Sequence, residues 1–107
     1  TRIAELKHGS IQEYTLDPRD FGLLYCQTSD LKAGSAAESA ARVQAVLAGE
    51  PGACRDIVLL NAGAAIYVAG VSDTLASGID AARHAIDSGA AQRTLAALVT
   101  RTQALAQ

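Results

Sequence analysis

The amino-acid sequence predicts the back part of an α/β domain, in which a β-hairpin is followed by several helices. Three observations support this fold class. Residues 1–16 alternate polar and apolar side chains on either side of a Lys-His-Gly-Ser turn. Residues 53–69 form a long run with few polar side chains, and capping residues divide the remaining sequence into further helices. Helices of different character behind a pair of strands are typical of such a domain.

The hairpin is expected over residues 1–16. Successive side chains of a strand point to opposite faces, and in residues 2–7 both faces mix polar and apolar groups, as at a sheet edge. Gly9 in the turn is free to take a positive φ. Because an isolated two-stranded hairpin is marginal in water, we expect these strands to extend a larger sheet.

A short helical turn and a loop are predicted to follow the hairpin. Asp17 can cap the turn, Pro18 suits its first position, and Gly22 ends it. Residues 23–26 are a brief apolar run, and residues 27–34 are predicted to be loop.

The first long helix is predicted to begin after Ser35. Ser35 and Glu38 have the spacing of a capping box, in which each side chain bonds a free backbone amide. Gly49 ends the helix and Pro51 prevents its continuation. The expected buried face of this helix comprises Ala36, Ala40, Val43 and Leu47.

The apolar helix over residues 53–69 is the most informative segment. From Ile57 to Ala69 only Asn61 and Tyr67 carry polar side-chain groups. A surface helix keeps a polar face, so this one belongs inside a larger body. It rises only about 20 Å, too little to span a bilayer. We expect the Asn61 amide to bond a backbone group or strand end, and the helix to need more protein around it than this chain supplies.

Two further helices are predicted behind the apolar one. Asp73 is the expected cap of the first, and Ser88-Gly89 separates the two. We expect Gly63 and Gly70 of the apolar segment to let a neighbouring element approach closely. The apolar stripes are Leu75, Ile79, Ala82 and Ile86 in the first helix, and Leu95, Leu98, Val99, Thr102 and Leu105 in the second.

Composition excludes several classes of function. The net charge is −2 and no basic patch is visible, which argues against nucleic acid and anionic membranes as partners. We find no signal peptide and no transmembrane segment. Cys26 and Cys54 lack metal-binding or redox spacing, so both are expected to be reduced and semi-buried, in a cytoplasmic protein. The start at Thr1 and the over-apolar helix together indicate a piece of a longer chain.

The sequence nominates no catalytic, cofactor-binding or metal-binding residue. His8 lies in a predicted turn and His84 on the polar side of a predicted helix, and neither has a second ligand nearby. The loop acids Asp17, Asp20 and Asp30 are explained by turns and caps. No glycine-rich phosphate-binding pattern occurs.

Arg55 and Asp56 open the apolar helix together. We expect a local ion pair between them and favourable charge at the first helical turn.

Several phrases of the sequence resemble bacterial anthranilate phosphoribosyltransferases. They are IAEL at 3–6, YTLDPRDFGL at 14–23, DLKAG at 30–34, RDIVLLNAGAAIYVAG at 55–70 and AIDSGAA at 85–91. They agree with that family in order and spacing over nearly the whole chain. The resemblance implies that residues 1–107 are the C-terminal part of the α/β domain of a nucleoside-phosphorylase/phosphoribosyltransferase-like protein.

The resemblance also implies an activity. The family transfers the phosphoribosyl group of phosphoribosyl pyrophosphate to anthranilate in tryptophan biosynthesis, with Mg²⁺, as a cytoplasmic homodimer joined through a separate helical domain. That domain, the pyrophosphate loop, the Lys-His-Gly-Asn stretch and the Asp-Glu pair that holds magnesium are expected outside this chain. Lys7-His8-Gly9 echoes one motif, but Ser10 replaces its asparagine, so no catalytic, cofactor or metal role is carried over.

We therefore expect a segment that supports an active site without entering it and that is inactive alone. Ile57→Asp is expected to destabilise the complete enzyme severely, because it would bury an unpaired charge. Two alternatives stay open. One is a paralogous phosphoribosyltransferase or nucleoside phosphorylase with another acceptor, and the other is a non-enzymatic helical interaction module.

Overall fold

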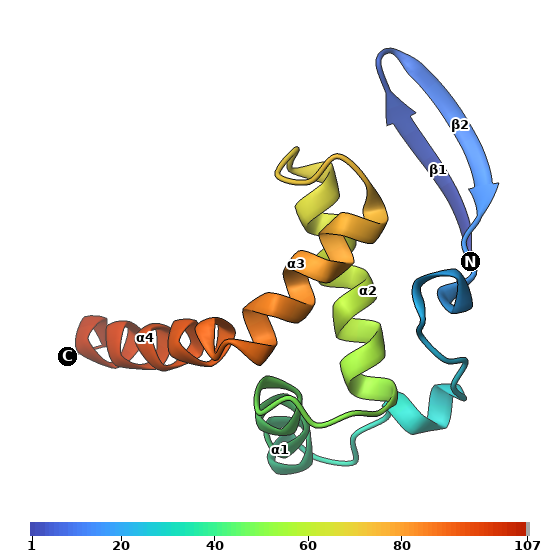
Figure 1. Ribbon diagram of the computed structural model, residues 1–107. Helices are drawn as coiled ribbons and strands as arrows, with labels where there is room; N and C mark the ends of the chain where they lie inside the picture. Colours follow the sequence, from blue (N-terminus) through green and yellow to red (C-terminus); the bar gives the residue numbers. More distant parts are fainter. Residues whose placement is uncertain (107) are drawn as a thin grey trace.

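The computed structural model describes residues 1–106 and confirms the predicted order, a β-hairpin followed by packed helices (Figure 1). Two short 3-10 helices, η1 and η2, connect the hairpin to the long helices. The elements are β1 (Arg2–Lys7), β2 (Ser10–Thr15), η1 (Pro18–Phe21), η2 (Thr28–Leu31), α1 (Ala36–Leu47), α2 (Ala53–Val68), α3 (Leu75–Asp87) and α4 (Ala90–Leu105).

The hairpin is an antiparallel pair closed by Lys7 and Ser10. Gly9 takes a positive φ of 78°, as expected, and His8 also lies in the left-handed region at φ 52°. Two consecutive residues with positive φ form the turn whose twist matches that of paired strands. Within residues 1–106 the sheet has only these two strands, so the outer edge of each strand is unpaired.

The turn after the hairpin also forms as predicted. The Asp17 carboxylate accepts a hydrogen bond from the backbone N–H of Arg19 at 2.9 Å. Gly22 ends η1 at φ 73°. The loop predicted over residues 27–34 contains the single turn of η2.

Helix α1 buries a different face from the predicted one. Val46 is its buried residue, whereas Ala36 and Ala40 are exposed and Val43 is 47% exposed. The predicted face is therefore wrong, with Leu47 half-buried as its best-covered member. The physical reason is that only the C-terminal part of α1 packs on the other helices, so its first turns lie in water.

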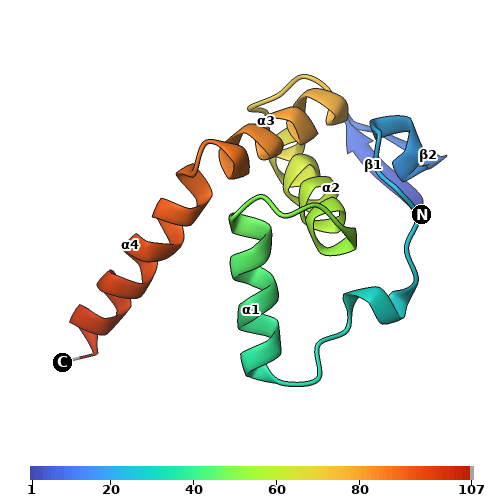
Figure 2. The same cartoon turned by 60° about the horizontal axis from the view of Figure 1, so that its bottom comes forward.

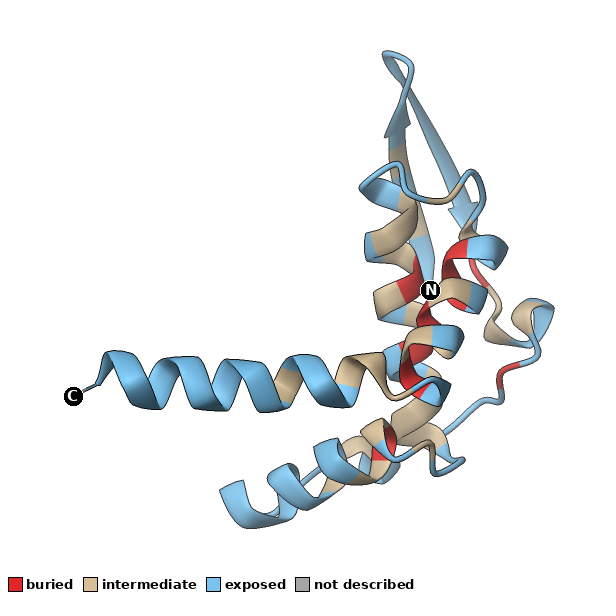
Figure 3. Ribbon diagram, turned by 60° about the vertical axis from the view of Figure 1, so that its left-hand side comes forward, coloured by how far each residue is buried: buried red, intermediate tan, exposed pale blue. Residues whose placement is uncertain are grey.

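The core lies where α2 and α3 cross (Figure 3). Leu59 of α2 and Ile79 of α3 are each 1% exposed and pack together with Ala82 and Ile86. The apolar stripe predicted for residues 75–86 is therefore confirmed.

The ends of α3 are partly as predicted. Thr74, not Asp73, caps the helix, because the Thr74 hydroxyl accepts a hydrogen bond from the N–H of Ser77 at 3.0 Å. Ser88 ends α3, and Gly89 follows at φ 83° before α4 begins, which confirms the predicted break.

The two glycines of the apolar segment differ in role. Gly63 is buried against α3, which confirms the predicted close approach. The prediction for Gly70 is wrong: space around it is open, and its φ of 78° serves the end of α2.

Much apolar surface stays uncovered. Helix α2 buries only Leu59 and Gly63 fully, and Ile57 is 40% exposed. Helix α4 forms as predicted but has no buried residue, and it extends away from the other helices (Figures 1 and 2). The radius of gyration is 15.8 Å, compared with about 13 Å for a compact chain of this length. The apolar side chains of α2 and α4 therefore lack the covering by other protein that the sequence predicts.

No helix within residues 1–106 combines the length and the apolar character needed to cross a bilayer.

Candidate functional site

The densest polar cluster joins the hairpin to the end of α2. The Tyr67 hydroxyl donates a hydrogen bond to Glu5 Oε2 at 2.6 Å and accepts one from Lys7 Nζ at 3.1 Å. The Tyr14 hydroxyl donates to the other Glu5 oxygen at 2.9 Å. The Lys7 ammonium also lies 5.2 Å from the centre of the Tyr67 ring, within cation–π range. We call Glu5, Lys7, Tyr14 and Tyr67 the hairpin cluster.

The protonation states within the hairpin cluster follow from these contacts. Hydrogen bonds from Tyr67 and then Tyr14 hold the pKa of Glu5 below its ordinary value. The bond to Tyr67 raises the pKa of Lys7, and the bond to Glu5 raises that of Tyr14. The shifts at Glu5 and Lys7 favour their charged forms, and the shift at Tyr14 favours its neutral hydroxyl. The cluster thus joins the hairpin to the end of α2 through hydrogen bonds to charged partners.

The cluster escaped sequence analysis because its members lie far apart in the chain. Only the three members in the hairpin could be placed together from the sequence. Glu5 and Lys7 share a strand face, and the register places Tyr14 opposite Ile3 on that same face. Nothing in the sequence indicated that Tyr67 would meet them.

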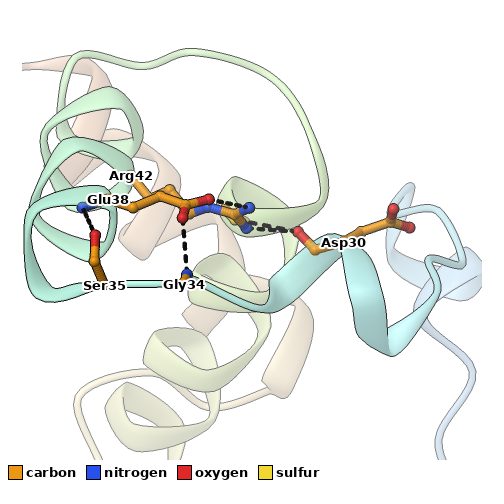
Figure 4. A network of polar contacts seen from close by, with 6 residues as sticks. Asp30, Gly34, Ser35, Glu38 and Arg42 are labelled. Carbon is orange, nitrogen blue, oxygen red and sulfur yellow. Dashed lines mark hydrogen bonds and ion pairs between the residues drawn. The ribbon is translucent and has the colours of Figure 1, made fainter.

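A second polar network begins α1 (Figure 4). The Ser35 hydroxyl accepts a hydrogen bond from the N–H of Glu38 at 3.1 Å, as predicted. The Glu38 carboxylate, however, accepts from the N–H of Gly34 at 2.8 Å rather than from that of Ser35. Its other oxygen pairs with Arg42 at 3.3 Å, and Arg42 donates to the Asp30 carbonyl at 2.8 Å. The network fixes the entry of the chain into α1.

The two cysteines are free and differ in exposure. Cys54 is half-buried, as predicted, with its sulfur 3.6 Å from Arg42 Nη1. Cys26 is exposed, so its predicted burial is wrong. It lies in the segment after Leu23 that leaves the core.

The two charged residues at the start of α2 bond different partners. Arg55 forms a two-pronged ion pair with Asp87 of α3, at 2.8 and 3.0 Å, rather than with Asp56. Asp56 instead accepts a hydrogen bond from the N–H of Leu24 at 3.3 Å. Adjacent residues on a helix point in different directions, so the predicted local pair is wrong.

The remaining candidate residues lie apart and take structural roles. The Asn61 amide donates to the Ile57 carbonyl of its own helix at 2.8 Å, which confirms a backbone partner, although Asn61 is exposed. Asp30 caps η2 by accepting from the N–H of Gln27 at 2.8 Å. His8 and His84 are exposed on separate elements.

No cluster of three His, Cys, Asp or Glu side chains within the described part of the chain is arranged to hold a metal ion.

Two hollows of the surface are lined mainly by apolar side chains, whereas the hollow beside the hairpin cluster has charged side chains in its lining. A groove of about 310 Å³ runs between α1, η2 and the first half of α2. It is lined mainly by aliphatic side chains, among them Val43, Val46, Ile57 and Val58. A smaller hollow of about 230 Å³ separates Leu24 and Tyr25 from α2. Such surfaces suit contact with other protein rather than chemistry on a polar substrate.

Comparison with known proteins assigns a family to this arrangement. A family model described as "Glycosyl transferase family, a/b domain" matches residues 1–92. Three curated relatives are each named anthranilate phosphoribosyltransferase. The relative from Laribacter hongkongensis is 56% identical over 99% of this chain and 31% of its own length. Those from Chromobacterium violaceum and Nitrosospira multiformis are 52% and 50% identical, over 96% and 92% of this chain and 30% and 28% of their own lengths. The chain thus spans about a third of these relatives.

Proposed function

The chain belongs to the glycosyl transferase family, a/b domain, and from this membership we propose that it is part of an anthranilate phosphoribosyltransferase. The complete enzyme would transfer the phosphoribosyl group of phosphoribosyl pyrophosphate to anthranilate, in tryptophan biosynthesis. The observation that carries the proposal is the 56% identity to a protein of that name over nearly the whole of this chain.

Within that enzyme, this segment would have a supporting role. The core at the α2–α3 crossing is tightly closed, and the described residues place no set of acid, base and nucleophile together. Phosphate- and metal-binding groups need rigid surroundings to stay in productive geometry. We therefore assign residues 1–107 to the backing of the domain and the chemistry to other parts of the polypeptide.

The cofactor and partners of the proposed enzyme would be held outside this chain. Asp17 and Asp30 serve caps, Asp87 serves an ion pair, and the acids of the described residues form no group of three that could hold a metal ion, so we propose that magnesium would be bound elsewhere in the polypeptide. The enzyme would work in the cytoplasm as a homodimer, joined through a separate helical domain. The apolar faces of α2 and α4 would pack against the remainder of the same polypeptide.

A turnover assay on the longer polypeptide tests the proposal. With phosphoribosyl pyrophosphate and Mg²⁺ present, we expect anthranilate to be consumed and pyrophosphate to be released in equal amounts. Residues 1–107 alone serve as the matched control and are expected to give no turnover. Consumption of another acceptor but not of anthranilate would replace the proposal with the paralogue alternative.

Light scattering on residues 1–107 tests the interaction-module alternative. The exposed apolar faces and the large radius of gyration favour a segment that needs covering, so we expect the isolated chain to aggregate. A monodisperse, cooperatively folded oligomer would favour the module.

A further inference from the structure

The hairpin is held to the helices by very few contacts. Among residues 1–106, every hydrogen bond between residues 2–15 and a helix ends on the hydroxyl of Tyr67. Figure 1 shows the hairpin extending beyond the end of α2, with no helix covering its far side. Among the described residues, Tyr67 is therefore the polar link between the hairpin and the helices.

The hairpin has a polar face toward Tyr67 and an apolar face that points away from the helices. The face toward Tyr67 carries Glu5 and Lys7, and the register adds Tyr14 beside them. On the opposite face Leu6 and Ile11 pair across the strands and are 73% and 71% exposed. With its apolar pair pointing away from the helices, the hairpin cannot be docked on α2 by burial of that pair.

The Tyr67 hydroxyl is suited to fix an angle because it uses two hydrogen bonds of different direction. It donates to Glu5 Oε2 and accepts from Lys7 Nζ, and both partners are ionised. Glu5 and Lys7 are two positions apart on β1, so the hydroxyl holds the strand at two points. Asp73, in the connection after α2, is a further charge that favours the charged form of Lys7.

We propose that Tyr67 is the positioning residue of the hairpin: its hydroxyl sets the orientation of β1–β2 on α2 and so directs the two open strand edges toward the rest of the domain. The assignment rests on the proposed function only in taking the longer polypeptide as the molecule to be tested. Loss of the hydroxyl would leave the angle between the hairpin and α2 to be set by the sheet neighbours of β1 and β2 alone, so the hairpin would tilt over a wider range about its connection at Leu16 while its own strand pairing persists.

The experiment measures the distance between two spin labels in the longer polypeptide by pulsed electron resonance. Labels are attached at Ile11→Cys on the outer face of the hairpin and at His84→Cys on α3, in a background that carries Cys26→Ser and Cys54→Ser. We expect one narrow distance distribution for this reference protein. Tyr67→Phe, which removes one oxygen and keeps the ring over which Lys7 lies, is expected to widen the distribution at least about twofold.

Tyr14→Phe is the matched control. It deletes the same atom from a residue that bonds the same Glu5 carboxylate, but the lost bond lies within the hairpin. We expect its distance distribution to match that of the reference. Glu5→Ala is the second variant: it removes the acceptor of the Tyr67 hydroxyl, is expected to widen the distribution like Tyr67→Phe, and keeps the test decisive if Tyr67→Phe does not fold.

An unchanged width in Tyr67→Phe and Glu5→Ala would overturn the proposal, and so would equal widening in Tyr14→Phe. The distances are measured without substrate, so this result is independent of turnover. A longer polypeptide that lacks transferase activity would contradict the proposed function while leaving the distance comparison valid.

Discussion

Gly63 of α2 and Ile79 of α3 lie so close that a Cβ atom on Gly63 would be 2.5 Å from Cγ1 of Ile79 and 2.7 Å from its backbone N and Cα atoms. The relationship is reciprocal, because a Cβ on Gly78 would overlap the carbonyl oxygen of Gly63. The two helices therefore meet backbone to backbone at this pair of glycines. Ile79 and Leu59 are buried beside the contact, where the core is tightest.

Gly63→Ala is expected to destabilise the protein. At an ordinary helix position the change from glycine to alanine stabilises by about 1 kcal/mol, but here the added methyl group must push α3 away, which costs about 1–3 kcal/mol. Denaturant unfolding of the longer polypeptide measures the difference. Ala65→Gly, at an exposed position of the same helix, controls for helix propensity and is expected to cost about 1 kcal/mol. A gain in stability from Gly63→Ala would contradict the backbone contact.

Leu59→Ala tests the burial at the centre of the core. Leu59 is 1% exposed, and loss of its side chain is expected to lower the free energy of unfolding by about 2–5 kcal/mol. Gln44→Ala on α1 is the control, because Gln44 is an exposed polar residue and such surface changes cost less than about 0.5 kcal/mol. The midpoint of chemical denaturation should fall clearly in Leu59→Ala and stay close to that of the unaltered protein in the control. Equal effects would show that Leu59 is not the centre of this core.

Ile57→Asp tests whether other protein covers the outer face of α2. Ile57 is 40% exposed within residues 1–106, where an aspartate carboxylate at this position would still reach water. In the longer polypeptide the same carboxylate would be buried without a partner, at a cost of about 3–5 kcal/mol. Thermal unfolding of the longer polypeptide that carries Ile57→Asp, with Ile57→Val as the conservative control, makes the comparison. An unchanged melting temperature in the longer polypeptide would refute the proposed covering.

Asp17 is expected to titrate far below other carboxyl groups. Its side chain bonds the Arg19 guanidinium through both oxygens and accepts from the Arg19 amide, and these contacts lower its pKa from 3.8 to about 2. A depressed carboxyl pKa gives stability that is complete above the ordinary value and is lost as the pH falls toward 2. Carbon-detected NMR titration measures the pKa directly.

Arg19→Gln is the matching variant for this titration. It removes the charge but keeps the backbone amide, so the pKa of Asp17 should rise part of the way toward 3.8. A titration near 3.8 in the unaltered protein would contradict the paired geometry.

Local signals in the sequence predicted the elements well. Asp17, Ser35 and Gly89 each mark an element boundary through chemistry within a few residues, and each boundary is found in the structure. The stripe around Ile79 was also readable, because the period of a helix identifies its apolar face without knowledge of its partner.

The sequence did not predict which residues of different elements contact each other. Val46 rather than Val43 is buried on α1 because the site of helix contact, and not the pattern along the helix, decides the covered face. Arg55 reaches Asp87 rather than its neighbour for the same reason. The cluster around Tyr67 needed the register of a hairpin and the place of a distant helix end together.

The unpaired margins of β1 and β2 have a practical consequence for handling this segment alone. Each margin offers a row of free backbone donors and acceptors that another copy can match, and Leu6 and Ile11 add an apolar surface beside them. Separate production of residues 1–107 therefore invites strand-by-strand stacking into filaments. Synthesis together with the rest of the polypeptide would occupy those margins first and keep the preparation dispersed.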